Sequence, residues 1–320
     1  MRKVLVTGAL GQIGSELTAE LRRICGPRNV IATSRRGPPE TEISDGCRFE
    51  LLDVTHREAV NRAFARHEVD TVFHLAAILS ATGEQDPQLA WTVNIEGLRN
   101  VLGAAHAHGV KQVFWPSSIA AFGPDTPREH TPQLTVMRPN TMYGITKAAG
   151  ELLCDYYAQR YGLDVRGVRY PGVISSATMP GGGTTDYAVE MFYAALRHER
   201  YRCFVSAGTM LPMIYMPDCI KAAIDLMFAD RSSLRHANAY NLAAMSVCAM
   251  ALVDEIRKHV PGFECTFEPD YRQQIADAWP RSIDDSAARA DWHWRPKFDL
   301  AATAADMMER LKAKQRAGQL

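Results

Sequence analysis

Residues 2–24, RKVLVTGALGQIGSELTAELRRI, decide the fold of this chain. The apolar residues 2–7 predict a short buried strand, and the apolar residues after the glycines recur at helical spacing. Between strand and helix stand Gly8, Gly11 and Gly14. Glycines at this turn let backbone N–H groups at the helix N-terminus approach a pyrophosphate, although tight packing of a strand on a helix also requires small residues. The stretch therefore predicts a strand–loop–helix unit that binds a dinucleotide.

The second strand-like run bears on which nicotinamide cofactor is expected. Residues 29–34, NVIATS, end about twenty residues after Gly14, where an acidic side chain normally binds the adenosine ribose hydroxyls. This chain has Ser34, Arg35 and Arg36 there. Guanidinium groups pair well with a 2′-phosphate, but the arginines could equally begin a solvated, proline-rich loop. We expect NAD, with NADP as the open alternative. The residues expected around this end of the cofactor are Gly8, Gly11, Gln12, Ile13, Gly14, Ser34 and Arg35.

Strand-like and helix-like segments alternate through the first half of the chain. Further strand-like runs end at Asp53, Ala77, Ser118 and Gly172, and helical patterns separate them. This alternation predicts an α/β fold, a Rossmann-like doubly wound parallel sheet with a smaller C-terminal substrate-binding domain. We expect residues 1–172 and 213–244 to form the dinucleotide-binding domain. Residues 173–212 and 245–320 are expected to form the substrate-binding domain.

Composition narrows the class of ligand. Lys+Arg and Asp+Glu balance at 36 each, which gives no reason to expect nucleic acid or a membrane surface as a partner. The seven cysteines are scattered without zinc-ligand spacing, so we expect no metal and a reducing, cytoplasmic location. The first strand begins so early that no leader peptide is expected. A small molecule is the expected ligand.

The clearest chemical signal is Tyr143-Gly-Ile-Thr-Lys147 at the start of a predicted helix. The i, i+4 spacing places the phenol and the ammonium on one helical face. An ordinary tyrosine has a pKa of about 10 and is a poor base at neutral pH, so a nearby lysine that stabilises the phenolate would make it useful. Ser117 and Ser118 follow a strand end and are candidate hydrogen-bond donors to the reacting oxygen. These four residues are the expected catalytic group.

These motifs taken in order, TGALGQIG, Asp53, HLAA, VNIEG, SSIAAFG, YGITK and RYPG, resemble an extended short-chain dehydrogenase/reductase of the NAD-dependent epimerase/dehydratase superfamily. The resemblance covers nearly all of residues 1–172. It implies that Ser118, with Ser117 as the adjacent candidate, acts with Tyr143 and Lys147. The further cofactor-contacting residues that it implies are Asp53, Val54, Leu75, Ala76, Ala77, Asn94, Tyr143, Lys147, Tyr170 and Pro171, with Gly172 near the nicotinamide.

Segments from residue 72 to residue 294 resemble the short-chain type of L-threonine 3-dehydrogenase more closely, and GGGTTDYA is the most specific of them. A glycine run before a helix can close over a small molecule, and Thr185 or Asp186 is a natural N-cap. Trp279 is expected to line the pocket or to pack between domains. The substrate-binding residues expected on this resemblance are Ser80, Ser118, Tyr143, Gly183, Thr184, Thr185, Asp186 and Trp279.

The resemblance implies a metal-independent oxidation of the β-hydroxyl of L-threonine to 2-amino-3-ketobutyrate, with hydride transfer to NAD, in a homodimer. One alternative is a nucleotide-sugar 4-epimerase or dehydratase, which is the commoner activity in the superfamily. The other is a cofactor-sensing regulator without turnover, against which the intact Ser118, Tyr143 and Lys147 argue.

Overall fold

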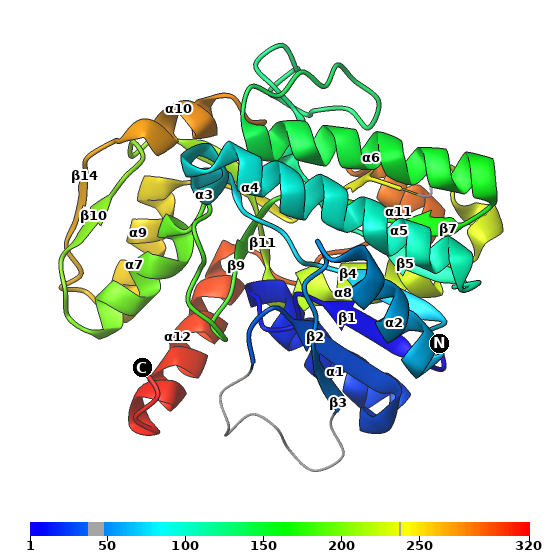
Figure 1. The fold of residues 1–320 in the computed structure, drawn as a ribbon. Coiled ribbons are helices and arrows are strands. Elements are labelled where there is room, and N and C mark those ends of the chain that lie inside the picture. The colour runs from blue at the N-terminus through cyan, green and yellow to red at the C-terminus, as the bar shows by residue number, and fades with distance from the viewer. Residues whose placement is uncertain (38–47, 237) are drawn as a thin grey trace.

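The computed structural model describes residues 1–37, 48–236 and 238–320, and within them a six-stranded parallel sheet forms the centre of the N-terminal part (Figure 1). Its strand order is β3-β2-β1-β4-β5-β7, and each neighbouring pair runs parallel. This is the doubly wound arrangement, and it confirms the predicted fold class. The strands are β1 (Val4–Thr7), β2 (Val30–Ser34), β3 (Arg48–Leu51), β4 (Thr71–His74), β5 (Gln112–Phe114) and β7 (Asp164–Arg166).

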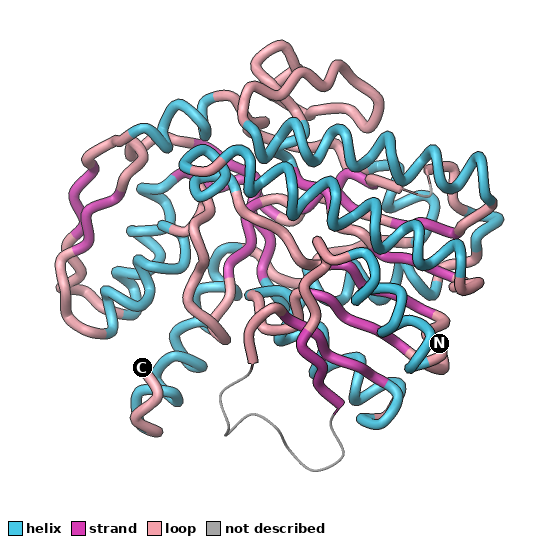
Figure 2. The backbone as a smooth tube through the Cα atoms, in the orientation of Figure 1, coloured by secondary structure: helices cyan, strands magenta, loops and turns pink. Residues whose placement is uncertain are grey.

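Helices cover both faces of this sheet, as Figure 2 shows. Alternate residues of one strand point to opposite faces: Val4 and Val6 pack in the cluster that includes α1 and α8, whereas Leu5 packs with α2 and α5. The central strands are therefore apolar on both faces. The flanking helices are α1 (Gln12–Cys25), α2 (Arg57–His67), α5 (Gly97–Ala107), α6 (Met142–Tyr161) and α8 (Met216–Phe228).

Two strand-like runs of the sequence are each divided in the structure. The run that ends at Ser118 gives β5 and then, beyond Pro116, β6 (Ser117–Ser118), which pairs with β8 (Val168–Tyr170). The run that ends at Gly172 divides at Gly167, where an added Cβ would lie 2.3 Å from the Trp115 carbonyl oxygen. Proline lacks the N–H of a regular ladder, and the close backbone approach admits only glycine, so both breaks have a local cause.

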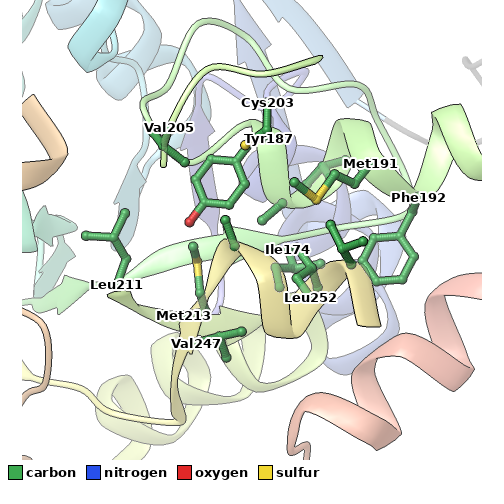
Figure 3. Close-up of a cluster of buried hydrophobic side chains, with 14 of the residues drawn as sticks. Ile174, Tyr187, Met191, Phe192, Cys203, Val205, Leu211, Met213, Val247 and Leu252 are labelled. Carbon is green, nitrogen blue, oxygen red and sulfur yellow. The ribbon is translucent and has the colours of Figure 1, made fainter. Parts of the chain in front are cut away.

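The second part of the molecule packs around a cluster of apolar side chains that includes Tyr187, Met213 and Leu252 (Figure 3). Its strands are β9 (Gly172–Ile174), β10 (Tyr201–Cys203), β11 (Met210–Tyr215), β13 (Met245–Cys248) and β14 (Cys265–Phe267), with β12 (Tyr240–Asn241) beside β8. Its helices are α7 (Tyr187–Leu196), α9 (Ala249–His259), α10 (Tyr271–Asp277) and α12 (Leu300–Arg316).

The segment after residue 245 is shared between the two parts. Helix α11 (Ser286–Trp292) contacts β12, and Trp292 and Trp294 pack in the cluster of α1 and α8. Met307 and Met308 of α12 instead pack in the cluster of α7 and α9. The domain boundaries stay a prediction. In the described part of the chain, none of the helices combines the length and apolar character needed to cross a bilayer.

Candidate active site

One cavity of about 450 Å³ lies beyond the carboxyl ends of the parallel strands. Its walls come from the glycine loop after β1, the segment after β4, the start of α6, and residues 170–186. Ligands of doubly wound sheets bind at this edge, near the switch in strand order between β1 and β4. The predicted site residues that line it are Gly8, Gly11, Gln12, Ile13, Gly14, Leu75, Ala77, Ser80, Ser117, Ser118, Tyr143, Lys147, Tyr170, Pro171, Gly172, Gly183, Thr184, Thr185, Asp186 and Trp279.

The glycine loop is shaped to accept a phosphate group. Gly8 has a φ of +67°, and a Cβ on Gly14 would lie 2.1 Å from the Gly8 carbonyl oxygen, so both positions require glycine. Gly11 is the N-cap of α1, and the first turn of this fully described helix carries no acidic residue. The Nε2 donor of Gln12, which lines the cavity, is buried without a partner among the described residues. The Gln12 amide donor and the N-terminus of α1 together fit a dinucleotide pyrophosphate.

Asp53 and Ser34 are the residues predicted to lie at the adenosine end of the cofactor. Asp53 Oδ1 accepts hydrogen bonds from the backbone N and the Oγ1 of Thr55, at 2.9 and 2.7 Å. Burial acts to raise the pKa of Asp53, but these hydrogen bonds, with the charges of His56 and Arg35, outweigh it and leave the pKa below its usual value. Ser34 ends β2, and its Oγ accepts from the Arg36 N at 3.4 Å. The continuation of this loop, residues 38–47, lies outside the described residues.

Six of the predicted cofactor residues do not line the cavity: Ser34, Arg35, Asp53, Val54, Ala76 and Asn94. Asn94 uses its whole amide group to hold the segment after β4. Its Oδ1 accepts from the Ile78 N at 2.8 Å, and its Nδ2 donates to the Ile78 carbonyl oxygen at 3.1 Å and to Thr146 Oγ1 at 3.0 Å. Asn94 therefore ties a cavity wall to α6.

Helix α6 presents Tyr143 and Lys147 to the cavity. The Thr141 Oγ1 caps its start by accepting from the Gly144 N at 3.1 Å. Lys147 Nζ donates to the Pro116 carbonyl oxygen at 2.6 Å and lies 5.5 Å from the centre of the Tyr143 ring. Burial lowers the pKa of Lys147 to about 8. The ammonium is thus held in place by the backbone that precedes β6.

Burial also raises the pKa of Tyr143 to about 12, and the Ser118 hydroxyl opposes this rise by hydrogen bonding. The sequence led us to expect that Lys147 would hold the pKa of this phenol down, and in the protein alone desolvation outweighs any such effect. A phenolate at this position therefore needs more positive charge than the chain itself supplies.

The two neighbouring serines differ in their hydrogen bonds. Ser117 Oγ is buried and donates to Glu151 Oε1 at 2.5 Å. Ser118 is only partly buried, and its Oγ accepts from the Ala120 N at 3.2 Å, which leaves its own hydrogen free to turn toward Tyr143.

Residues 181–186, GGGTTD, form a segment over one side of the cavity, which we call the flap. The sequence predicts Thr185 or Asp186 as the N-cap of the helix that follows, and Asp186 occupies the N-cap position of α7 without a side-chain cap hydrogen bond. Its Oδ2 instead turns back and accepts from the backbone N of Gly182 at 2.9 Å and of Gly183 at 2.7 Å. Gly182 and Gly183 precede the helix, so their N–H groups have no helical partner and the Asp186 carboxylate accepts from them instead of capping α7. Burial raises the pKa of Asp186 to about 6.

The flap is fastened to the short helix α3 (Ser80–Gln85). Ser80 Oγ accepts from the Thr184 N at 3.1 Å and lies 2.9 Å from Thr184 Oγ1, and the Ala81 N donates to the Gly182 carbonyl oxygen at 3.1 Å. Trp279 is 5% exposed and lines the same cavity.

Several lining residues were not predicted from the sequence. They include Leu10, Ile78, Leu79, Thr82, Ile119, Val173, Thr178 and Met179. Most are apolar and follow strand ends, so only their position beside a motif could have indicated them. Thr178 and Met179 are separated from the glycine run at 181–183 only by Pro180.

Comparisons with known proteins agree with this geometry. The model of the NAD dependent epimerase/dehydratase family matches residues 4–243. An uncharacterized epimerase/dehydratase of Staphylococcus haemolyticus is 48% identical over 316 residues, 98% of this chain and 99% of that protein.

Two solved structures are equally similar. A GalE-like L-threonine dehydrogenase from Cupriavidus necator, in its holo form, is 50% identical with a TM-score of 0.93, covering 97% of this chain and 99% of that one. A monomeric L-threonine 3-dehydrogenase from a metagenome, in its apo form, is 48% identical with a TM-score of 0.94 and the same coverage. The resemblance inferred from the motifs is therefore confirmed.

Proposed function

Because the chain belongs to the NAD dependent epimerase/dehydratase family, we propose that it is an L-threonine 3-dehydrogenase that oxidises the β-hydroxyl of L-threonine to 2-amino-3-ketobutyrate. The observation that carries this proposal is the joint position of Tyr143, Lys147 and the 181–186 flap on one cavity. Two L-threonine dehydrogenases of known structure support it, because each is about half identical in sequence to this chain and aligns with nearly its whole length.

The nicotinamide cofactor, when bound, accepts the hydride. Tyr143 takes the proton of the substrate hydroxyl, and Ser118 donates to the oxygen on which charge develops. Lys147 supplies positive charge beside the phenol and is fixed by the Pro116 carbonyl. The flap, held by Ser80 and Asp186, encloses the amino acid and excludes water, and Asp186 Oδ1 is a candidate partner for the α-ammonium.

We further propose a cytoplasmic homodimer. Ile145, Leu152 and Tyr156 form an exposed apolar stripe along α6, and Leu152 is 67% exposed. Their spacing puts them on one face of the helix, which a second copy could cover. The relative described as monomeric makes the oligomeric state a matter for direct measurement. The free thiols among the described residues suit a reducing compartment.

A nucleotide-sugar 4-epimerase or dehydratase activity is the second candidate, because the relative from Staphylococcus haemolyticus is described as an epimerase/dehydratase. The experiment that separates the two follows absorbance of reduced nicotinamide with L-threonine, D-threonine and L-serine, each with NAD and with NADP. Conversion of UDP-glucose is followed separately by chromatography of the sugar product, because epimerisation or dehydration leaves no net reduced nicotinamide. Reduction with L-threonine and NAD alone supports the proposal. Turnover of the UDP-sugar without L-threonine oxidation contradicts it, and cofactor binding without any turnover favours the sensor reading.

A further inference from the structure

Three side chains of α6 interact with one short stretch of the chain, residues 116–118. The Ser118 hydroxyl acts on Tyr143 by opposing the rise that burial causes in the pKa of its phenol, Lys147 donates to the Pro116 carbonyl oxygen at 2.6 Å, and the next residue on this face, Glu151, accepts from Ser117 Oγ at 2.5 Å. The spacing i, i+4, i+8 keeps all three on one side of the helix. The third member of this row has no part in the chemistry proposed above.

Glu151 is 3% exposed and ion-paired in the interior. The guanidinium of Arg169 on β8 donates to both of its oxygens, through Nε at 2.9 Å and Nη2 at 2.8 Å. Arg169 is itself fixed by the Gln133 carbonyl oxygen at 2.8 Å and by Asn241 Oδ1 at 3.0 Å. A buried bidentate pair of this kind is rigid because each side chain has one well-satisfied geometry.

The segment that carries the two serines is therefore fixed at three successive residues. Trp115 packs against Gly150, where an added Cβ would lie 2.4 Å from the ring. Pro116 is held by Lys147, and Ser117 is held by Glu151. With the Ser117 hydroxyl donated to a buried carboxylate, the alternating direction of a strand leaves Ser118 as the serine whose hydroxyl is available to the cavity.

We propose that Glu151 is a positioning residue for the proposed reaction: it holds Ser117 so that Ser118 donates to the reacting oxygen, and its negative charge helps to keep Lys147 protonated. The inference rests on the proposed function for its kinetic part only. The charge relation between Glu151 and Lys147 belongs to the protein whatever its substrate.

The other charged and titratable groups around Lys147 and Glu151 allow the sign of the effect to be stated. Burial lowers the pKa of Lys147, while Cys154 and Glu151 on α6 act to raise it. His74 on β4 is buried, and burial and then Lys147 lower its pKa to about 3, so it is neutral. Asp155 also lies near Glu151, and Arg169 balances the carboxylate from β8. Removing the Glu151 charge therefore lowers the pKa of Lys147 and moves its deprotonation to lower pH.

The first test needs no substrate. Competitive acetylation of the whole protein over a pH series, read by peptide mass spectrometry, gives the titration of Lys147 in the wild type, in Glu151→Gln and in the charge-retaining Glu151→Asp. We expect the Lys147 midpoint to fall in Glu151→Gln and to stay near the wild-type value in Glu151→Asp. An unchanged midpoint in a folded Glu151→Gln protein overturns the charge role.

The second test is kinetic. Ser117→Ala should lower kcat by roughly tenfold to 10²-fold with little change in KM, because a small misplacement of Ser118 costs rate rather than binding. Wild-type kcat in Ser117→Ala overturns the positioning role. Asp164→Asn is the matched control: it breaks a similar ion pair, with Arg166, on β7, and should change neither kcat nor the Lys147 midpoint. If the wild type does not oxidise L-threonine, the proposed function fails, and the titration still decides this inference.

Discussion

Ser80 and Thr184 lie 104 positions apart in the chain, yet their hydroxyl oxygens are 2.9 Å apart and Ser80 also accepts from the Thr184 backbone N. This pair joins α3, which follows the carboxyl end of β4, to the flap that precedes α7. Two side chains therefore link the flap to the segment that leaves the parallel sheet.

Loss of this contact should weaken substrate binding more than chemistry. Ser80→Ala and Thr184→Val are each expected to raise KM for L-threonine about tenfold with a smaller change in kcat, since the flap then spends less time closed. The double variant should cost less than the product of the two single effects, because both remove the same hydrogen bond. Fully multiplicative losses would mean that the two residues act separately.

Asp186 gives the flap a dependence on pH. Its pKa of about 6 in the fold lies above the usual value, so the folded protein binds this proton more tightly than the unfolded chain does. Stability contributed by the protonated form is present below about pH 4 and is lost as the pH rises to about 6. Asp186→Asn should therefore raise the melting temperature at pH 7 relative to wild type, and this gain should shrink toward pH 4. A constant difference across the pH series would contradict the assignment.

Cofactor choice should depend on Ser34. A carboxylate at this strand end accepts hydrogen bonds from ribose hydroxyls and repels a 2′-phosphate. We expect Ser34→Asp to lower kcat/KM for NADP by more than about tenfold while kcat/KM for NAD stays equal or rises. Steady-state kinetics with both cofactors measure the ratio. Equal losses for the two cofactors would show that Ser34 does not face the ribose.

The apolar stripe on α6 predicts how the chain assembles. Leu152→Glu places a charge at its centre and should convert a dimer to a monomer in light scattering, whereas Lys111→Glu, at an exposed site before β5, should leave the mass unchanged. A wild-type protein that is already monomeric at micromolar concentration would contradict the homodimer.

The parts of this site that could be predicted from the sequence depend on local spacing. The Gly8-to-Gly14 loop and the Tyr143–Lys147 pair each fall within one turn or one helix face, so the linear pattern fixes their geometry. The role of Asp186 could not be predicted, because the choice between a helix cap and the glycine N–H groups depends on how the flap folds back. The role of Glu151 could not be predicted for a similar reason. It lies on α6, and its partners Ser117 and Arg169 lie on β6 and β8.

The pKa of Tyr143 shows the same limit. The i, i+4 lysine is real, but burial around the phenol, which no spacing reveals, raises its pKa to about 12. In the proposed reaction, the bound cofactor and Lys147 together would favour the phenolate.

The proposed reaction requires Tyr143 to remove the proton from the substrate hydroxyl. Its most direct test is the rate of NAD reduction by L-threonine in the wild type and in Tyr143→Phe, with NAD affinity measured in parallel by calorimetry. We expect Tyr143→Phe to bind NAD as the wild type does and to lose kcat by about 10³-fold or more. Near-wild-type turnover in Tyr143→Phe would rule out Tyr143 as the base.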